Sequence, residues 1–326
     1  MIIQGLAGKF LGPVLISLFL LLFIMPGYIK LIRQKSFGQQ IRELGPDSHQ
    51  KKAGIPTTGG FLIFLAVIIN LLWFYSPGLE KLMVLLVLAI NALLGLADDY
   101  LSIKKGQSLG VRAWTKLGFQ ALSGLMLGFF LFFTGRTTIV WPFTTNLLEL
   151  GWLIIPLSLL VIMGSSNAVN LSDGLDGLAA GLTIISLIFF LPFLWIQQEV
   201  DLIVLALAGI GGSLGFLWYN IHPARIFMGD VGSLFLGTLL AVIALLSEGV
   251  FLLPLLGAVF VVETLAVIIQ VTYFKLTKGE RVFLMSPLHH HYELKGWAET
   301  QVTGRFYILQ VIAGFITLFS YWPLLI

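Results

Sequence analysis

Long apolar stretches alternate with short polar segments along the whole chain. Each apolar stretch is close to the roughly 20 residues that an α-helix needs to cross the hydrocarbon core of a membrane. The period-two alternation of a transmembrane β-barrel is absent from the sequence. We therefore predict an all-α, polytopic integral membrane protein with ten transmembrane helices. The predicted spans are residues 11–29, 58–75, 82–97, 117–134, 151–164, 178–195, 202–218, 232–247, 250–274 and 305–323.

Composition supports the membrane class and narrows the chemistry. Of the 326 residues, 58% are hydrophobic and 11% are charged, which leaves too little polar surface for a soluble globular protein. The chain has no cysteine, so disulfides, thiolate metal sites and cysteine nucleophiles are excluded. No linker-like segment separates the spans, and we expect one domain over residues 1–326. The first apolar stretch lacks a cleavage site, so we expect it to be retained as a helix.

The distribution of lysine and arginine predicts the orientation of the helices. All of these residues except Lys9, Lys81 and Arg136 fall in alternate connections, at residues 30–57, 98–116, 165–177, 219–231 and 275–305. Short cytoplasmic loops carry the Lys/Arg excess in membrane proteins. We therefore place these connections in the cytoplasm and both termini on the extracytoplasmic side. We expect the active site in the cytoplasmic connections, which are the longer ones.

The pair Asp98 and Asp99 is predicted to close the third span at its cytoplasmic end. Carboxylates at a helix C-terminus meet the negative end of the helix dipole and repel each other, so they need a cation nearby. The alternative is a solvated helix end with Lys104 and Lys105 as counter-ions. We favour metal or substrate chemistry for this pair.

A second polar segment precedes the sixth span. Two asparagines, two aspartates and two glycines fall within residues 167–177, among them Asn170, Asp173 and Asp176. The simpler explanation is that Ser172 or Asp173 caps the following helix, with Asp176 near the positive end of its dipole. The segment has more polar side chains than a cap requires, and its glycines would let a ligand approach the backbone closely. We therefore favour a binding role.

Another carboxylate, Asp230, precedes the eighth span in the same orientation. Taken alone, it could be an ordinary helix cap. Together with the other aspartates it supplies oxygen ligands without thiolates, a donor set that favours Mg²⁺ or Mn²⁺ over zinc. A magnesium ion at this face would in turn imply a phosphorylated substrate.

Three consecutive histidines, His289, His290 and His291, stand in the last predicted cytoplasmic loop. Successive residues on a helix point about 100° apart, so three could not face one ligand there, whereas an extended segment puts His289 and His291 on one face. The alternatives are a solvated loop or a zinc site; we favour hydrogen bonding to a diphosphate.

On the ninth span, Glu263 and Gln270 share one face, and an intramembrane carboxylate is either functional or hydrogen-bonded between helices.

Five segments occur in the order found in one enzyme family. They are the basic, glycine-rich residues 45–60, the pair Asp98-Asp99 with Tyr100, Asn170-Leu-Ser-Asp-Gly-Leu-Asp-Gly177, Gly229-Asp-Val-Gly-Ser-Leu234, and His289-His-His-Tyr-Glu293. Over nearly its whole length the chain resembles the phospho-N-acetylmuramoyl-pentapeptide transferases, which belong to the polyprenyl-phosphate N-acetylhexosamine-1-phosphate transferase superfamily.

The resemblance implies an activity, a cofactor and partners. Similar enzymes move phospho-MurNAc-pentapeptide from its UDP carrier to undecaprenyl phosphate, giving lipid I and UMP, with Mg²⁺ as cofactor. This reaction is the first membrane step of bacterial peptidoglycan synthesis. The implied location is the inner (cytoplasmic) membrane, and the implied partners are the two substrates and the lipid bilayer, with a homodimer as a candidate assembly and no nucleic acid.

The resemblance also implies residue roles. Asp98, Asp99 and Asp230 match catalytic positions, and Asp230 also matches the magnesium ligand. Phe227 matches the aromatic residue that stacks on uracil. The other positions that match substrate-binding residues are Lys52, Lys116, Asn170, Asp173, Asp176, Asn220, Gln270, His289, His290 and His291. Many relatives have a lysine three residues after the aspartate pair; here that residue is Ser102, so the role passes to Lys104 or Lys105 or is absent.

Two other functions fit part of the sequence. A related polyprenyl-phosphate GlcNAc-1-phosphate transferase would share the aspartate segments but differ in the histidine loop, which argues against it. A nucleotide-sugar transporter would show internal repeats and polar groups near the membrane midplane, whereas the carboxylates here stand mainly at the predicted cytoplasmic ends.

For the transferase we expect direct in-line attack by the lipid phosphate, with a covalent phospho-enzyme on an aspartate as the rival mechanism.

Overall fold

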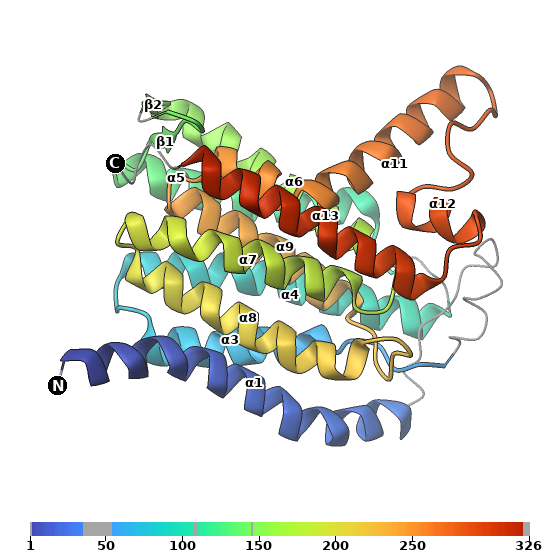
Figure 1. Ribbon diagram of the computed structural model, residues 1–326, viewed down its shortest axis with the longest axis horizontal. Helices are drawn as coiled ribbons and strands as arrows, with labels where there is room; N and C mark the ends of the chain where they lie inside the picture. Colours follow the sequence, from blue (N-terminus) through green and yellow to red (C-terminus); the bar gives the residue numbers. More distant parts are fainter. Residues whose placement is uncertain (1, 35–53, 107–109, 145, 322–326) are drawn as a thin grey trace.

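The chain folds into a bundle of long helices that run roughly side by side (Figure 1). The computed structural model describes residues 2–34, 54–106, 110–144 and 146–321. The main helices are α1 (Ile2–Gln34), α3 (Gly60–Phe74), α4 (Leu79–Lys105), α5 (Ala113–Phe133), α6 (Ile154–Ser172), α7 (Leu178–Ile196), α8 (Val200–Asn220), α9 (Gly229–Leu246), α11 (Ala258–Leu276) and α13 (Glu299–Ser320). The shorter elements are β1 (Thr138–Val140), β2 (Leu147–Glu149), η1 (Gly151–Leu153), η2 (Val250–Leu252), α10 (Leu253–Leu256) and α12 (Leu288–Leu294).

In the described residues, nine helices are long and apolar enough to cross a membrane. They are α1, α4, α5, α6, α7, α8, α9, α11 and α13, with η1 adding the first turn of the α6 span. Helix α3 is apolar too but has 15 residues, which at about 1.5 Å per residue span roughly 22 Å, less than the ~30 Å hydrocarbon core. The predicted all-helical, multi-pass membrane class is confirmed. Nine helices of the described residues meet the length of a span, and the count of ten stays a prediction.

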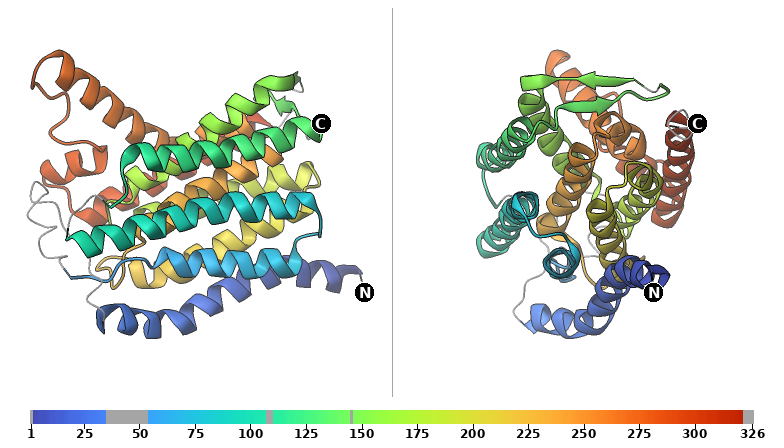
Figure 2. Two further views of the ribbon diagram at one scale, coloured as in Figure 1. Left: turned by 180° about the vertical axis from the view of Figure 1, so that it is seen from behind. Right: turned by 90° about the vertical axis from the view of Figure 1, so that its left-hand side faces the viewer.

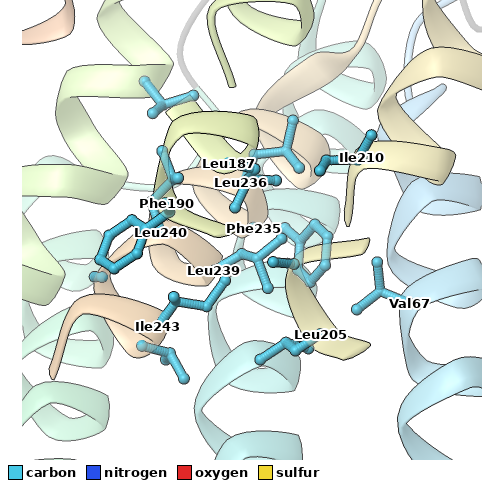
Figure 3. Packing of buried hydrophobic residues seen from close by; sticks show 14 of the residues in the cluster. Val67, Leu187, Phe190, Leu205, Ile210, Phe235, Leu236, Leu239, Leu240 and Ile243 are labelled. Atoms are coloured by element: carbon cyan, nitrogen blue, oxygen red, sulfur yellow. The ribbon is translucent and has the colours of Figure 1, made fainter. Parts of the chain in front are cut away.

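Helix α9 forms the centre of the bundle. It packs against α3, α4 and α6, and sixteen of its eighteen residues are buried. Figure 3 shows Leu236, Leu239 and Leu240 of α9 among apolar side chains from α3, α7 and α8. A helix that is apolar on all sides belongs in an interior, which explains the position of α9.

Glycines permit the closest helix crossings. A Cβ atom on Gly60 would lie 2.1 Å from the Cα atom of Gly232, so α3 and α9 touch backbone to backbone. A Cβ atom on Gly95 of α4 would lie 2.3 Å from the carbonyl oxygen of Asp230 at the start of α9. Small residues allow membrane helices to approach this closely. The second crossing brings the start of α9 against the turn of α4 that follows Gly95.

Amide side chains join neighbouring helices inside the bundle. Asn91 of α4 donates to the hydroxyl of Ser123 on α5 at 3.0 Å. Asn167 of α6 donates to Oε1 of Gln120 on α5 at 2.8 Å. Such bonds satisfy polar groups that have no water partner in a membrane, and here they fix α4, α5 and α6 relative to one another.

The two ends of the bundle differ in structure. Both ends of the described chain lie at one end, while α12 and the α6–α7 and α8–α9 connections lie at the other (Figures 1 and 2). The end with the termini also carries an antiparallel hairpin in which Thr138 pairs with Glu149. No strands were predicted there from the sequence. Helix α11 leans away from the bundle above α12 (Figure 1).

Helices α4 and α6 are among those that extend beyond their predicted spans, and both carry candidate site residues in the extension. Helix α4 continues to Lys105 and ends at Gly106, whose left-handed conformation closes it, so Asp98 and Asp99 lie about two turns inside the helix. The prediction that they close it was wrong, because the lysines of the last turn favour a helix C-terminus beyond the apolar run. Helix α6 continues to Ser172, so Asn170 lies on its last turn and not in a connection.

Candidate active site

Three charged side chains meet where α4, α5 and α9 converge. The ammonium group of Lys116 lies 2.6 Å from Oδ2 of Asp230 and 3.0 Å from Oδ1 of Asp98. Lys116 comes from the first turn of α5, Asp98 from α4 and Asp230 from the first turn of α9. Residues that the sequence marked separately therefore form one cluster, which we call the Lys116 cluster.

Asp230 is fixed by a donor on each carboxylate oxygen. Lys116 donates to Oδ2, and the amide of Asn170 on α6 donates to Oδ1 at 3.0 Å and to the hydroxyl of Ser233 at 2.9 Å. The alternative that Asp230 caps its own helix was wrong. Asp230 lies in the first turn of α9, and the residue at the N-cap position is Met228, whose side chain makes no capping hydrogen bond. A quarter of the Asp230 side chain is exposed, so its carboxylate is accessible from outside the bundle.

Asp99 has a different environment from Asp98. Its Oδ1 accepts the backbone N–H of Asp230 at 2.9 Å, and its Oδ2 accepts that of Val231 at 3.1 Å. A carboxylate at a helix N-terminus satisfies N–H groups that the helix leaves unpaired and meets the positive end of its dipole. Asp99 therefore caps α9 from α4, which is a structural role that its position in the sequence did not indicate.

Asp98 faces the start of α5. Its Oδ1 accepts the backbone N–H of Val111 at 2.7 Å as well as the ammonium of Lys116. Lys105, which the sequence offered as a counter-ion for the aspartate pair, instead donates to the carbonyl oxygen of Gly110 at 2.9 Å. The counter-ion of Asp98 is thus Lys116, which approaches from the next helix and not from the end of α4.

The α6–α7 connection carries Asp173, which directly follows α6. Burial, together with the nearby negative charges of Asp230 and Asp176, raises the pKa of Asp173 to about 7. The proposed capping by Ser172 or Asp173 was wrong, because α7 begins after Gly177 and no described side chain caps it. Negative charge is therefore concentrated beside the Lys116 cluster.

Asp176 anchors this connection to two other parts of the chain. Its Oδ2 accepts the backbone N–H of Ala224 at 3.0 Å and lies 2.9 Å from Nδ1 of His222. Its own backbone N–H donates to Oε1 of Glu299 at 2.6 Å, at the start of α13. The Asn220 side chain adds a further link, accepting from the N–H of Gly177 at 3.0 Å. These contacts hold the α6–α7 connection against α8 and α13.

The three histidines lie on the short helix α12. The extended conformation that would place His289 and His291 on one face is therefore wrong. His289 is fully buried, whereas His290 and His291 are partly exposed. His290 pairs with Glu293 at 2.9 Å, and Nδ1 of His291 accepts the backbone N–H of Leu284 at 3.1 Å. The structure thus brings His289 beside the α6–α7 connection and gives each histidine a different environment.

Gln270 on α11 holds the segment that precedes α12. Its Oε1 accepts the backbone N–H groups of Val282 at 3.1 Å and Phe283 at 2.9 Å, and its Nε2 donates to the carbonyl of Phe283 at 3.2 Å. The sequence suggested Gln270 as a pocket residue. All three contacts instead support the backbone of the loop.

Phe227 lies in the α8–α9 connection against the described part of the first loop. Its N–H donates to the carbonyl of Pro56 at 2.8 Å, and its own carbonyl accepts from Gly59 at 2.9 Å. The ring is partly exposed. Lys52, which the sequence predicts as a substrate-binding residue, lies outside the described residues.

Several residues of this region were not predicted as site residues from the sequence. Ser233 accepts from Asn170, and His222 and Glu299 surround Asp176. Ser233 lies near the start of α9, Glu299 begins α13, and His222 lies in the α8–α9 connection. Their partners are more than forty residues away in the sequence, so no local pattern could reveal them.

Two groups of described side chains offer ligands for a metal ion. In the Lys116 cluster, Asp98 and Asp230 share one ammonium group, so a negative charge stays uncompensated among oxygen donors, which suits Mg²⁺. In the second group, ligand atoms of Asp176, His222 and Glu299 lie within 4.8 Å of one another. A histidine with two carboxylates suits a transition metal better than Mg²⁺, and His222 already faces both carboxylates.

Substitution of Gly174 tests the packing of α12 on the α6–α7 connection. A Cβ atom there would lie 2.2 Å from Nε2 of His289, so Gly174→Ala must displace the imidazole or the connection. We expect a loss of turnover of about 10²-fold, the effect of a small misplacement in an active site. Gly164→Ala on α6 is the matched control, because a Cβ atom there meets nothing within 4 Å. Equal activity of the two variants in a product-release assay would contradict the role of this contact.

Comparisons with known proteins identify the family of the chain. The model of glycosyl transferase family 4 matches residues 81–248, which include Asp98, Lys116, Asn170 and Asp230. A phospho-N-acetylmuramoyl-pentapeptide-transferase of Desulfotalea psychrophila is 42% identical over 325 residues, covering 93% of this chain and 90% of the relative. Relatives of the same name from Heliobacterium modesticaldum and Halalkalibacterium halodurans are 45% and 39% identical, covering 93% and 94% of this chain and 95% of each relative. Because this similarity extends over nearly the whole length, the chain belongs to the phospho-N-acetylmuramoyl-pentapeptide-transferase family.

Proposed function

We propose that the chain transfers phospho-N-acetylmuramoyl-pentapeptide from its UDP carrier to undecaprenyl phosphate, forming lipid I and releasing UMP. Membership of the family supports the activity. The relatives are named as this transferase, and the similarity to them covers nine-tenths or more of each chain. The observation that carries the proposal is the Lys116 ammonium between Asp98 and Asp230. A lysine beside carboxylates that could bind a metal ion is a combination that phosphoryl-transfer sites use.

The chain crosses the bacterial inner membrane ten times, with α3 as the short tenth crossing, and its active site faces the cytoplasm. The excess of lysine and arginine in alternate connections supports this orientation. So does the position of both described ends of the chain at the end of the bundle away from α12 (Figure 1). A homodimer stays a prediction.

The reaction is a direct, in-line displacement at the sugar-linked phosphorus. An oxygen of undecaprenyl phosphate forms the new P–O bond, the bond to the bridging oxygen breaks, and UMP leaves with that oxygen and its electron pair. The second pKa of a phosphate monoester is near 6, so the lipid phosphate is mostly a dianion at neutral pH and needs little help from a general base. Positioning and charge neutralisation therefore account for most of the catalysis.

Each member of the Lys116 cluster has a task in this displacement. Lys116, whose side chain is a fifth exposed, presents its ammonium to the transferred phosphoryl group and offsets the negative charge there. Asp98 orients the lipid phosphate and accepts any proton that it still carries. Asp99 acts through α9, since both of its oxygens bind the N–H groups that begin that helix.

Asp230 would hold a magnesium ion, because its carboxylate oxygens belong to a group with uncompensated negative charge. When bound, Mg²⁺ supplies positive charge that stabilises the transferred phosphate and the departing UMP. Asn170 keeps Asp230 in a fixed orientation through its bond to Oδ1.

The residues around the Lys116 cluster form the pocket for the nucleotide and the diphosphate. Phe227 stacks on the uracil ring, and the partly exposed His290 and His291 donate hydrogen bonds to phosphate oxygens. Asp173, Asp176 and Asn220 line or support the α6–α7 connection, and His289 and Gln270 support the loop that leads into α12. Lys52 adds a positive charge from the first loop.

One assay tests the function against both alternatives. Purified protein is incubated with undecaprenyl phosphate and either UDP-MurNAc-pentapeptide or UDP-GlcNAc, and UMP and lipid product are measured. We expect UMP and lipid I with the first donor alone. Release of UMP with UDP-GlcNAc alone would identify a GlcNAc-1-phosphate transferase, and uptake of nucleotide sugar into vesicles without UMP would identify a transporter.

The one-step mechanism has its own test. Protein without lipid acceptor is incubated with donor labelled in the sugar-linked phosphate and then denatured. We expect no label to stay on the chain. A labelled aspartate, formed at the rate of turnover, would establish a covalent phospho-enzyme in place of the direct displacement.

A further inference from the structure

Glu263 is a buried carboxylate on the membrane-spanning helix α11, with 1% of its surface exposed. Its Oε2 accepts the backbone N–H of Leu288 at 2.6 Å, and its Oε1 accepts that of His289 at 3.1 Å. These are the first two residues of α12, which no described side chain caps from the Pro287 position. Glu263 therefore satisfies the start of α12 from a neighbouring helix.

The same carboxylate faces the imidazole of His289. Nδ1 of His289 lies 3.3 Å from Oε1 of Glu263, and both side chains are 1% exposed. On the other side, a Cβ atom on Gly174 would lie 2.2 Å from Nε2 of the imidazole. His289 is thus enclosed between α11 and the α6–α7 connection that carries Asp173 and Asp176.

The two ring nitrogens of His289 have unlike surroundings. Nδ1 faces a carboxylate that already accepts two backbone N–H groups, as an ionised, acceptor-only group does. Nε2 faces the α6–α7 connection. Neither ring nitrogen has a hydrogen-bond partner among the described residues, so Nδ1 differs from Nε2 in lying 3.3 Å from a carboxylate oxygen and interacts with it electrostatically. A carboxylate beside one ring nitrogen selects the tautomer with the proton on that nitrogen. Nε2 then keeps its lone pair toward the connection.

We propose that Glu263 is a positioning residue for the transfer reaction. It fixes the Nδ1–H tautomer of His289, and through this imidazole it holds the α6–α7 connection in the geometry that Asp173 and Asp176 need. The kinetic part of this role rests on the proposed transferase function. Carboxylates that orient a functional histidine typically change activity about 10- to 100-fold when they are removed.

A spectroscopic measurement tests the tautomer without any substrate. The full chain is labelled with ¹⁵N-histidine and reconstituted in bilayers; of its five histidines, the signals lost in His289→Gln belong to His289. We expect a protonated Nδ1 and an unprotonated Nε2 in the wild type, and a shift of the proton to Nε2 in Glu263→Gln. Glu280→Gln, in the exposed turn after α11, is the matched control and should leave the signals unchanged. An unchanged tautomer in Glu263→Gln would overturn the proposal.

A kinetic cycle tests whether Glu263 acts through His289. We expect kcat for UMP release to fall about 10- to 100-fold in Glu263→Gln, with part of the loss recovered in Glu263→Asp, which keeps the charge. The double variant Glu263→Gln/His289→Gln should be no slower than His289→Gln alone, because the two residues form one functional unit. Additive losses would mean that Glu263 acts separately and would refute the mechanism. If wild-type protein releases no UMP from UDP-MurNAc-pentapeptide, the proposed function fails while the tautomer test remains decisive.

Discussion

Replacing Asp230 with asparagine should abolish transfer while the bundle stays folded. The carboxylate accepts from Lys116 on one oxygen and from Asn170 on the other, and an asparagine would turn an N–H₂ group toward one of these donors. The substitution also removes the uncompensated negative charge that suits Mg²⁺. Because the oriented charge acts on the transferred phosphate, we expect kcat to fall about 10³-fold. UMP release, measured across a range of Mg²⁺ concentrations, gives the result.

Asp201→Asn is the matched control for this substitution. Asp201 is also an aspartate in the first turn of a long helix, but it lies on α8 near Lys9, at the end of the bundle that carries the termini. The control should keep wild-type turnover and the same dependence on Mg²⁺. If Asp230→Asn worked at wild-type rates at low Mg²⁺, the metal role of Asp230 would be refuted. A Tm well below that of the control would indicate a folding defect and not a catalytic one.

The apolar stretches of the sequence predict the helices of this fold well, but they do not predict where each helix ends. The length of an apolar run reports the part of a helix that lies in the hydrocarbon core. Helix α4 continues beyond that part to Lys105, because its backbone bonds need no apolar side chains and its closing lysines favour the C-terminus. For the same reason the dipole argument for Asp98 and Asp99, which assumed a helix end, does not apply to their observed positions.

The chemistry of the site was predictable by residue type, but the partner of each residue was not. The sequence marked Asp98, Lys116 and Asp230, and the fold brings them within hydrogen-bonding distance. The sequence alone could not distinguish side chains that contact the substrate from side chains that hold the backbone in place. Gln270 and Glu263 both appeared as polar residues on one apolar helix, and only the folded chain shows that each binds N–H groups of the loop around α12. These pairings form between segments that no local pattern connects.

Substitution of the two adjacent aspartates should give opposite patterns of stability and activity. Asp99 binds the N–H groups of Asp230 and Val231, so Asp99→Asn leaves one buried donor facing an amide N–H₂ group. We expect the free energy of unfolding to fall by about 1–3 kcal/mol, with a lower Tm. Asp98 instead repels its neighbour Asp230 across Lys116, and Asp98→Asn relieves this repulsion. Its Tm should be equal to or above that of the wild type, while kcat falls about 10²-fold because the lipid phosphate loses its orientation.

The comparison of the two variants separates positioning through α9 from direct action on the substrate. Asp99→Asn displaces the start of α9 and with it Asp230, so its loss of activity should be accompanied by weaker binding of Mg²⁺ and should shrink at saturating metal. Asp98→Asn should lose kcat at every Mg²⁺ concentration, because the lipid phosphate is the group that it orients. Measurement of Tm and of UMP release against Mg²⁺ for both variants distinguishes the two roles. A lower Tm in Asp98→Asn together with an unchanged Tm in Asp99→Asn would reverse the assignment, and the cap on α9 would then have no part in holding the site together.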